Sequence, residues 1–548
     1  MSLRKLGVVV VVAVLTLLVG EATLRLLFEP PRYHSELLEF HPELGFRGVP
    51  GFRGTRSDAR GAFPLALDSS GLRGSDLSDA EPTSGALRVV FLGDSFLFAP
   101  GLRDEDLMTS RSVAALAERG IRAEVANLSA SDYGTGQELL LLRLLGPRLR
   151  PEVVVLVLYP GNDLANNSLA LAGTTAVSVG DYIRPYVVEE SGRLRVRWTH
   201  PLRSWLRRHS RLFAVAERHV LAMGAERRIS WLMPWPARPG QGERLEAGAA
   251  PREALELFRE PAPGSRWQTA WDDTFLLLRT LRDEVESLGA RLLVLVIPTI
   301  DQVHSNAKGV ALDLAIRRAT GAPLSDLLEW NLPEERLSRF FESEGIEARM
   351  LLGPLREAAQ SGAWIYQRDG HLALAGHELA AAVVGNWIAG DRAGPPAAAV
   401  EGRPVDRHPG GETEPATLDF RHRDHALHVG DGWLGWRRQV GEMPGGWELG
   451  RRGLLVLPDR AAPLVMRGVV LPETSLPVVL EMEVVWGPRR HVRLDLSGPF
   501  QVRLPVRPAN PPGAGSHAVV QIGQRGPLQS GIVVQEVGFE PLAPRGGD

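Results

Sequence analysis

The segment Leu87–Phe98, LRVVFLGDSFLF, contains the most informative boundary in the chain. Its first seven residues form a mostly apolar run, which is typical of a parallel strand buried on both faces. Gly93 and Asp94 end this run, and the residues after Ser95 read as the first turn of a helix. Ser95 therefore stands where ligand sites form in α/β proteins, at the carboxyl end of a strand. From this segment alone, Ser95 is either a nucleophile or the N-cap of the helix.

The same alternation continues along the chain. Three more buried-strand runs are AEVANLS (123–129), EVVVLVLY (152–159) and RLLVLVIP (291–298). The stretches 105–120, 136–149 and 271–290 between these runs have helical character, and a weaker strand–helix unit covers 345–359. A last helix closes the pattern near Gly390. Strands that alternate with helices predict an α/β domain with a mainly parallel sheet.

The length of 548 residues favours two or three domains. We expect an N-terminal segment over 1–32, an α/β domain over 33–390, a Pro/Gly/Ala-rich linker over 391–417 and a β-sandwich domain over 418–548. Within the α/β domain, 33–84 reads as an irregular lead-in with one or two edge strands. Residues 166–264 read as an insertion, with a hairpin around Ser191-Gly192 and one basic amphipathic helix from Leu202 to Met223.

Composition excludes several classes of function. The net charge is −3 and the arginines are scattered, so nothing indicates nucleic acid as a partner. The chain has no cysteine, which excludes disulfides, thiolate metal sites and a cysteine nucleophile.

The N-terminus indicates the compartment. Arg4 and Lys5 precede an uncharged apolar run from Leu6 to Gly20, and helical character continues beyond Glu21. Fifteen apolar residues are short for a span of about 20. We favour an uncleaved membrane anchor, with a cleaved signal peptide as the alternative. In both cases the positive flank places the N-terminus in the cytoplasm and the bulk of the chain outside.

A serine nucleophile needs a base and a group that orients the base. His371 is the best candidate for the base, because Asp369 lies two residues before it, just ahead of the last helix. His377, inside that helix, reads as structural. Asn162 follows the third strand in LYPGNDLANN and can donate to an oxyanion, although Gly-Asn-Asp is also common in turns.

Together these motifs resemble the SGNH/GDSL hydrolase superfamily. The matching blocks are Gly93-Asp94-Ser95, Gly161-Asn162-Asp163 and Asp369-Gly370-His371 with Gly376-His377, in the family's order. The resemblance covers about 40–390 apart from the insertion, and LDSSGLRGSD before the first strand also fits it. It implies a flavodoxin-like three-layer α/β/α fold with Ser95, Asp369 and His371 as the catalytic triad. It also implies an acyl-enzyme mechanism that requires no metal and no organic cofactor.

Two blocks depart from the family. The last block has Leu372-Ala373 where Trp-Asn is frequent. The other departure concerns a glycine whose backbone N–H joins the oxyanion hole in the family, since in NLSASDYGTG that place is occupied by Asp132. The resemblance thus implies an oxyanion hole of Ser95, Asp132 and Asn162, provided that the turn tolerates a side chain. Aspartate adopts unusual backbone conformations more readily than most residues. Its carboxylate opposes a developing oxyanion unless it points away.

The resemblance implies an esterase acting on O-acyl groups, with a cell-surface or exported bacterial glycan as the expected substrate. An O-acyltransferase of the same fold and a degenerate glycan-binding or scaffold protein are the alternatives. Trp433, Trp436 and Trp447 of the β-domain either stack on sugars or fill its core. The N-terminal helix makes the membrane a second partner. We expect a single-pass inner-membrane protein with its catalytic domain in the periplasm, or a secreted protein if the signal is cleaved.

Overall fold

The structure is a computed structural model of the chain. It describes residues 3–27, 37–58, 61–74, 82–172, 183–199, 201–222, 255–303, 328–361, 363, 365–367 and 370–390, and in the C-terminal part the strands 417–419, 433–440, 443–449, 452–458, 464–470, 478–484, 489–494, 498–504, 517–525 and 532–539. The predicted linker therefore lies outside the described residues, except for Thr417.

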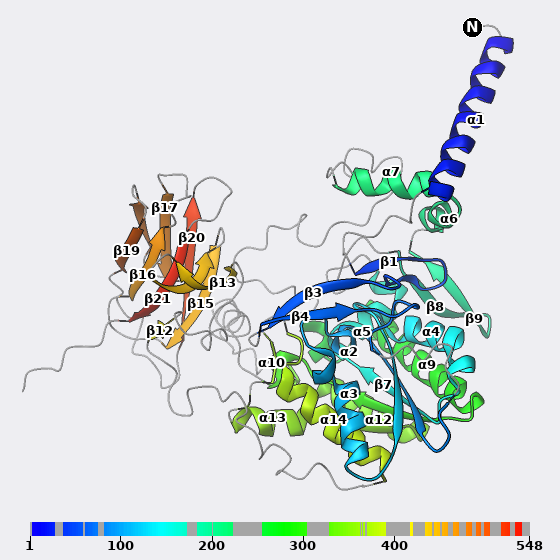
Figure 1. The fold of residues 1–548 in the computed structure, drawn as a ribbon. Coiled ribbons are helices and arrows are strands. Elements are labelled where there is room, and N and C mark those ends of the chain that lie inside the picture. Colours follow the sequence, from blue (N-terminus) through cyan, green and yellow to red (C-terminus); the bar gives the residue numbers. More distant parts are fainter. Residues whose placement is uncertain are drawn as a thin grey trace, which may run out of the picture.

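The α/β part is built on one five-stranded parallel sheet. Its strands are β5 (Leu87–Gly93), β6 (Ala123–Ser129), β7 (Val153–Leu158), β10 (Arg291–Val296) and β11 (Glu347–Met350). The order across the sheet is β6-β5-β7-β10-β11, which is the flavodoxin-like order 2-1-3-4-5. Helices cover both faces of the sheet, so the predicted three-layer α/β/α fold is confirmed (Figure 1).

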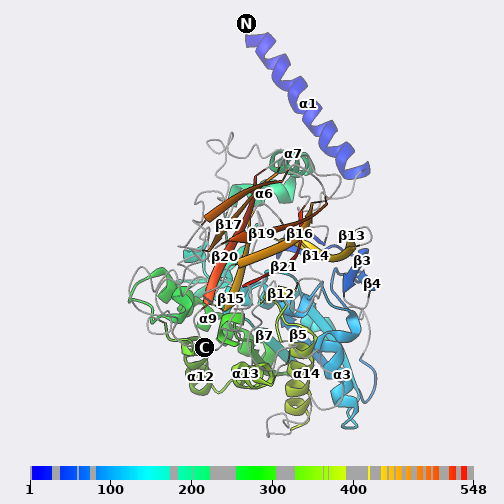
Figure 2. The same cartoon turned by 90° about the vertical axis from the view of Figure 1, so that its left-hand side faces the viewer.

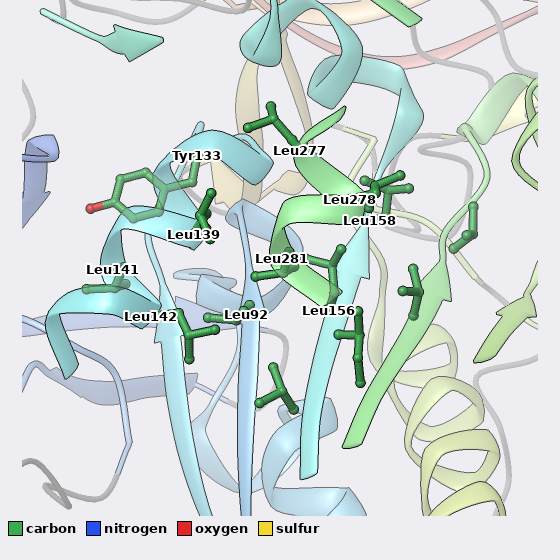
Figure 3. Close-up of a cluster of buried hydrophobic side chains, with 14 of the residues drawn as sticks. Leu92, Tyr133, Leu139, Leu141, Leu142, Leu156, Leu158, Leu277, Leu278 and Leu281 are labelled. Carbon is green, nitrogen blue, oxygen red and sulfur yellow. The ribbon is translucent and has the colours of Figure 1, made fainter. Parts of the chain in front are cut away.

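Alternate side chains of the strands supply two separate cores. Leu92 and Leu156 pack with leucines of α4 (Thr135–Leu149) and α9 (Arg266–Ser287), as Figure 3 shows. Helix α12 (Leu332–Glu344) joins the same core. On the opposite face, the neighbouring strand residues Phe91 and Val155 pack with α3 (Met108–Ala117), α13 (Leu352–Gln360) and α14 (Leu374–Ile388). This sorting explains why each strand reads as a continuous apolar run rather than an alternating one.

Shorter elements complete the α/β part. They are α2 (Ser95–Phe98), α5 (Pro160–Asn167), α10 (Ile300–Val303) and the 3₁₀ turns η1 (Asp104–Asp106), η2 (Leu169–Leu171) and η4 (Glu256–Phe258).

The lead-in contains two antiparallel pairs. Strand β1 (Leu38–His41) pairs with β2 (Gly45–Gly48), and β3 (Arg53–Asp58) pairs with β4 (Gly61–Ala66). The lead-in and the insertion lie in close contact at Gly45, where a Cβ would be 2.0 Å from the carbonyl oxygen of Ile183. Gly45 also has a positive φ of +79°. Only glycine fits this position.

The insertion begins with the expected hairpin, but the helix after it is broken. Strand β8 (Pro185–Glu190) pairs with β9 (Arg193–Trp198) around Ser191-Gly192, both at positive φ. One helix was expected from Leu202 onward, whereas the structure has α6 (Pro201–His209) and α7 (Arg211–Ala222). Ser210 causes the break, since its hydroxyl accepts from the Phe213 N–H at 3.0 Å, as a residue that starts a helix does.

The C-terminal part consists of antiparallel strands in two sheets. The first has the order β13-β14-β21-β16-β19 with β12 paired to β21, and the second has the order β15-β20-β17-β18. The strands are β12 (Thr417–Asp419), β13 (Trp433–Val440), β14 (Met443–Leu449), β15 (Arg452–Pro458), β16 (Leu464–Val470), β17 (Val478–Val484), β18 (Arg489–Leu494), β19 (Gly498–Leu504), β20 (His517–Arg525) and β21 (Ile532–Phe539). A β-sandwich requires these sheets to pack face to face, and that arrangement stays a prediction.

Helix α1 (Leu3–Leu27) is the one helix among the described residues that is long and apolar enough to cross a membrane. Its segment Lys5–Leu27 has a mean hydropathy of 2.4, and none of the described residues in the most apolar part of this segment is fully buried. A signal sequence has the same properties, so topology and compartment stay predictions.

Candidate active site

Three connections at the carboxyl edge of the sheet bring the predicted residues together. Ser95 opens α2 directly after β5, Asp132 lies in the turn after β6, and Asn162 lies in α5 after β7. Because β5 lies between β6 and β7, all three connections leave the same edge side by side. The fold thus converts three motifs that are distant in the sequence into one site.

Asp94, not Ser95, is the N-cap of α2. The Asp94 carboxylate accepts from the Phe96 N–H at 2.9 Å, so capping does not require the Ser95 hydroxyl. Gly93 leaves room for the Leu97 side chain, since a Cβ on it would lie 2.7 Å from Leu97 Cδ1. The simple capping interpretation of Ser95 is therefore wrong.

The Ser95 hydroxyl instead contacts His371. Ser95 Oγ and His371 Nε2 are 2.8 Å apart, and Ser95 is half-buried. The His371 ring lies beside the Phe96 ring at a centroid distance of 5.3 Å, and the His371 carbonyl accepts from the Gln367 N–H. Asp369 lies outside the described residues, so its role as the group that orients His371 stays a prediction.

Asn162 is held by Asp94. Its Nδ2 donates to Asp94 Oδ2 at 2.8 Å, and both side chains are nearly inaccessible to solvent. An amide nitrogen carries two hydrogens, and Asp94 uses one of them. The sequence motif does not reveal this contact, because Asp94 and Asn162 are 68 positions apart.

Burial dominates the electrostatics of these acids. It raises the pKa of Asp94 to about 6, although the Phe96 N–H, the Asn162 amide and His371 act in the opposite direction. Burial and the charge of Asp94 raise the pKa values of Asp163 and Glu138 well above their usual range, and Asp163 adds to the rise at Glu138. Asp163 accepts from the Tyr159 N–H at 2.7 Å and so closes the start of α5.

The turn after β6 tolerates aspartate. Asp132 has a φ of +64°, the left-handed conformation that favours glycine and that aspartate adopts at a small cost. The Asn166 amide fixes this turn, with its Nδ2 3.2 Å from the Asp132 carbonyl oxygen and 3.4 Å from that of Tyr133. Sequence reasoning missed Asn166, although it lies four residues after Asn162 and therefore on the same side of α5.

The negative charge of Asp132 reaches the site, because it contributes to the raised pKa of Asp94. We expect Asp132→Asn to raise kcat on an aryl ester about fivefold, since asparagine keeps the left-handed turn and removes a charge that opposes an oxyanion by about 1 kcal/mol. Steady-state kinetics at constant pH and ionic strength measure this. Asp132→Glu, which keeps the charge, is the matched control and should show no gain. An unchanged or lower kcat in Asp132→Asn would contradict the expectation.

His377 is structural, as expected. It is fully buried, and its Nδ1 accepts from the Met108 N–H at 3.1 Å, which caps the start of α3. Burial lowers its pKa to about 3, so the folded protein keeps this imidazole neutral.

Because His377 is buried in its neutral form, we expect the free energy of unfolding to fall in acid. Between about pH 6.5 and 3 the unfolded chain binds a proton that the folded one does not, so stability falls by about 1.4 kcal/mol per pH unit from this group. In urea unfolding, the loss between pH 7.5 and 5.0 should be about 2 kcal/mol smaller in His377→Gln, whose side-chain oxygen can still accept from Met108. Equal losses in both proteins would contradict this assignment.

Comparisons with known proteins add the following. No protein-family model matches the sequence, and no curated protein matches it. Solved structures with a similar arrangement include a two-domain esterase active on acetylated mannans, with 10% identity, a TM-score of 0.26, and coverage of 84% of this chain and 92% of that one. An acetyl xylan esterase has 13% identity and a TM-score of 0.27, and the match covers 55% of this chain and 99% of that one. A psychrotrophic esterase from Pseudoalteromonas sp. has 11% identity and a TM-score of 0.24, and the match covers 54% of this chain and 92% of that one. At such TM-scores these likenesses carry no argument, and the following proposal rests on the site and on the resemblance of its motifs.

Proposed function

We propose that this chain is a serine hydrolase of the SGNH type that cleaves carboxylic esters through an acyl-enzyme. The observation that carries the proposal is the 2.8 Å contact between Ser95 Oγ and His371 Nε2 at the carboxyl edge of the sheet. A hydroxyl in hydrogen-bond contact with an imidazole is the arrangement that activates a serine nucleophile.

In the proposed reaction, Ser95 Oγ attacks the ester carbonyl carbon while its proton passes to His371 Nε2. The tetrahedral intermediate then expels the alcohol, which takes the proton from His371 and leaves Ser95 acylated. Water attacks this second ester, again giving a proton to His371. The carboxylic acid leaves as Ser95 recovers its proton. Asp369 is proposed to orient the imidazole throughout.

The oxyanion is proposed to accept from three donors: the backbone N–H groups of Ser95 and Asp132 and the free hydrogen of the Asn162 amide. The bond from Asn162 to Asp94 supports this, since it fixes the amide before substrate arrives. A donor that is already in place does not reorganise during the reaction, and this is the main source of stabilisation in such sites.

The proposed substrate is an O-acyl group on a cell-surface or exported glycan. This half of the proposal rests on the resemblance of the motifs and on the C-terminal strands. Their register pairs Trp436 on β13 with Trp447 on β14, two of the three tryptophans considered for stacking on sugars.

The full chain in detergent can be tested with a fluorophosphonate probe and an aryl acetate. We expect covalent labelling that maps to Ser95, turnover of the acetate, and loss of both in Ser95→Ala. Ser110→Ala, on α3, is the matched control and should behave as the wild type. Absence of labelling and turnover in a folded wild-type protein would refute the proposal.

A second experiment tests the substrate by measuring acetate release from acetylated polysaccharides. Acyl transfer to an added sugar in preference to water would identify a transferase.

A further inference from the structure

The C-terminal half of α1 is fixed to the junction between α6 and α7. The Glu21 carboxylate accepts from the backbone N–H groups of Arg211 and Leu212 at 2.8 and 2.9 Å and from the Ser210 hydroxyl at 2.9 Å. Arg25 Nη2 donates to the His209 carbonyl at 2.6 Å. Glu21 thus binds the free N–H groups at the start of α7, a favourable site for a carboxylate. This junction cannot move independently of α1.

The position of Glu21 in α1 also determines how deep the α6–α7 junction would lie in a bilayer. The apolar run Leu6–Gly20 has 15 residues, and at 1.5 Å per residue it spans about 22 Å of a hydrocarbon layer of about 30 Å. If α1 crosses a bilayer with Lys5 at one boundary of the hydrocarbon layer, Glu21 and the first turn of α7 therefore lie within about 8 Å of the opposite boundary, a difference that local thinning of the bilayer can close. A carboxylate is tolerated there because hydrogen bonds satisfy it.

Helix α6 has two different faces. Arg203 and Arg207 are buried, where both pair with the buried Glu217, and the Arg207 guanidinium lies 5.5 Å from the centre of the Phe40 ring on β1. This face is therefore turned toward the α/β part. Leu202 and Trp205, three residues apart, are 63% and 56% exposed. Figures 1 and 2 both show α6 and α7 between α1 and the central sheet.

The surroundings of this exposed face are basic. From Arg193 to Arg211 the chain has seven arginines and no acidic residue. Glu217 neutralises part of this charge at Arg203 and Arg207, and Glu190 pairs with Arg197. Arg208 is exposed and lies over the Trp198 ring at 4.2 Å. An exposed tryptophan and leucine beside arginines are the composition that binds at the surface of an anionic bilayer.

We infer that α6 lies in the headgroup layer of an anionic phospholipid bilayer, with Leu202 and Trp205 at the acyl boundary. The α1–α7 contact sets its depth, and the Arg203–Glu217–Arg207 ion pairs join it to α7. The contact of the Arg207 guanidinium with the Phe40 ring of β1 joins it to the α/β part. The α/β part then stands at a fixed height on the membrane instead of swinging on a tether. This inference does not depend on the proposed chemistry.

The chain has no cysteine, so single-cysteine variants can be labelled at chosen sites. The full chain is reconstituted into vesicles of phosphatidylcholine and phosphatidylglycerol, and an environment-sensitive fluorophore is placed by Leu202→Cys or Trp205→Cys. Lipids with a nitroxide near the headgroup should quench both labels at least about twofold more than the controls, because an interfacial helix inserts about 5–10 Å. Leu144→Cys and Leu169→Cys, at leucines 41% and 39% exposed on the α/β part, are the matched controls. Val19→Cys, in α1, is the positive control.

Quenching at Leu202 and Trp205 no greater than at Leu144 would overturn the inference, whether or not Val19 is quenched. A second variant tests the contact that sets the depth. In Glu21→Gln, quenching at Trp205 should fall toward the Leu144 level while quenching at Val19 persists. Circular dichroism confirms that each variant is folded. Unchanged quenching at Trp205 in folded Glu21→Gln would show that α1 does not position α6.

Discussion

His371→Ala is expected to lower kcat on an aryl acetate by about four orders of magnitude, and adding Ser95→Ala should lower it little further. The physical reason is the single hydrogen bond that joins the two side chains. Without the imidazole the hydroxyl keeps its proton, and without the hydroxyl the imidazole has nothing to deprotonate. Residues that act as one unit lose their effect together, so their contributions do not add.

Steady-state kinetics of both single variants and the double variant measure this non-additivity. His377→Ala is a useful comparison, since this histidine is buried and not part of the site. It should lower stability while folded molecules keep most of their kcat. Losses that multiply in the double variant would show that Ser95 and His371 act independently, contrary to the proposed mechanism.

Arg73→Met is expected to lower the free energy of unfolding by about 3–5 kcal/mol. Arg73 is almost fully buried, and it donates to the carbonyls of Phe98, Ala99 and Leu102 and to the Asp104 carboxylate. These carbonyls belong to the end of α2 and the loop after it. Methionine fills a similar volume but has no donors, so the Phe98 and Leu102 carbonyls would lose the guanidinium as their donor, and the Ala99 carbonyl would keep only the Leu102 N–H.

Urea unfolding of the wild type, Arg73→Met and Arg73→Lys measures this effect. Arg73→Lys should retain only part of the stability that Arg73 provides, because one ammonium group cannot reach all the acceptors that the guanidinium contacts. Arg53→Met, at an exposed arginine of the same lead-in, is the control and should change stability by less than about 0.5 kcal/mol. If Arg73→Met were no less stable than Arg53→Met, Arg73 would not hold this loop.

The framework of the α/β part could be predicted because it depends on local patterns. Continuous apolar runs such as those ending at Gly93 and Leu158 are produced by strands buried on both faces, and the helices between them repeat with helical spacing. The resemblance supplied the strand order. Local capping did not follow from the motif, because Asp94 and Ser95 both favour helix starts and only the structure shows that Asp94 takes the cap.

Other features depend on contacts between distant residues and so could not be predicted. The break after His209 involves Glu21, 189 positions away from Ser210. The partners of Arg73 are backbone carbonyls, which every residue carries and no sequence pattern marks. The left-handed turn at Asp132 was foreseen as a requirement, but its support by Asn166 was not. The role of Asp369 stays a prediction.

The contact between Ser95 and His371 joins positions 276 residues apart. Synthesis supplies the N-terminal end first, and pairing of segments this distant waits for the later one. A growing chain that already contains α1, β5 and Ser95 therefore lacks its proposed base until the segment before α14 emerges. If the chain is exported as it is made, we expect the proposed nucleophile to stay inert during its passage and to become reactive only after the segment before α14 has also crossed and docked.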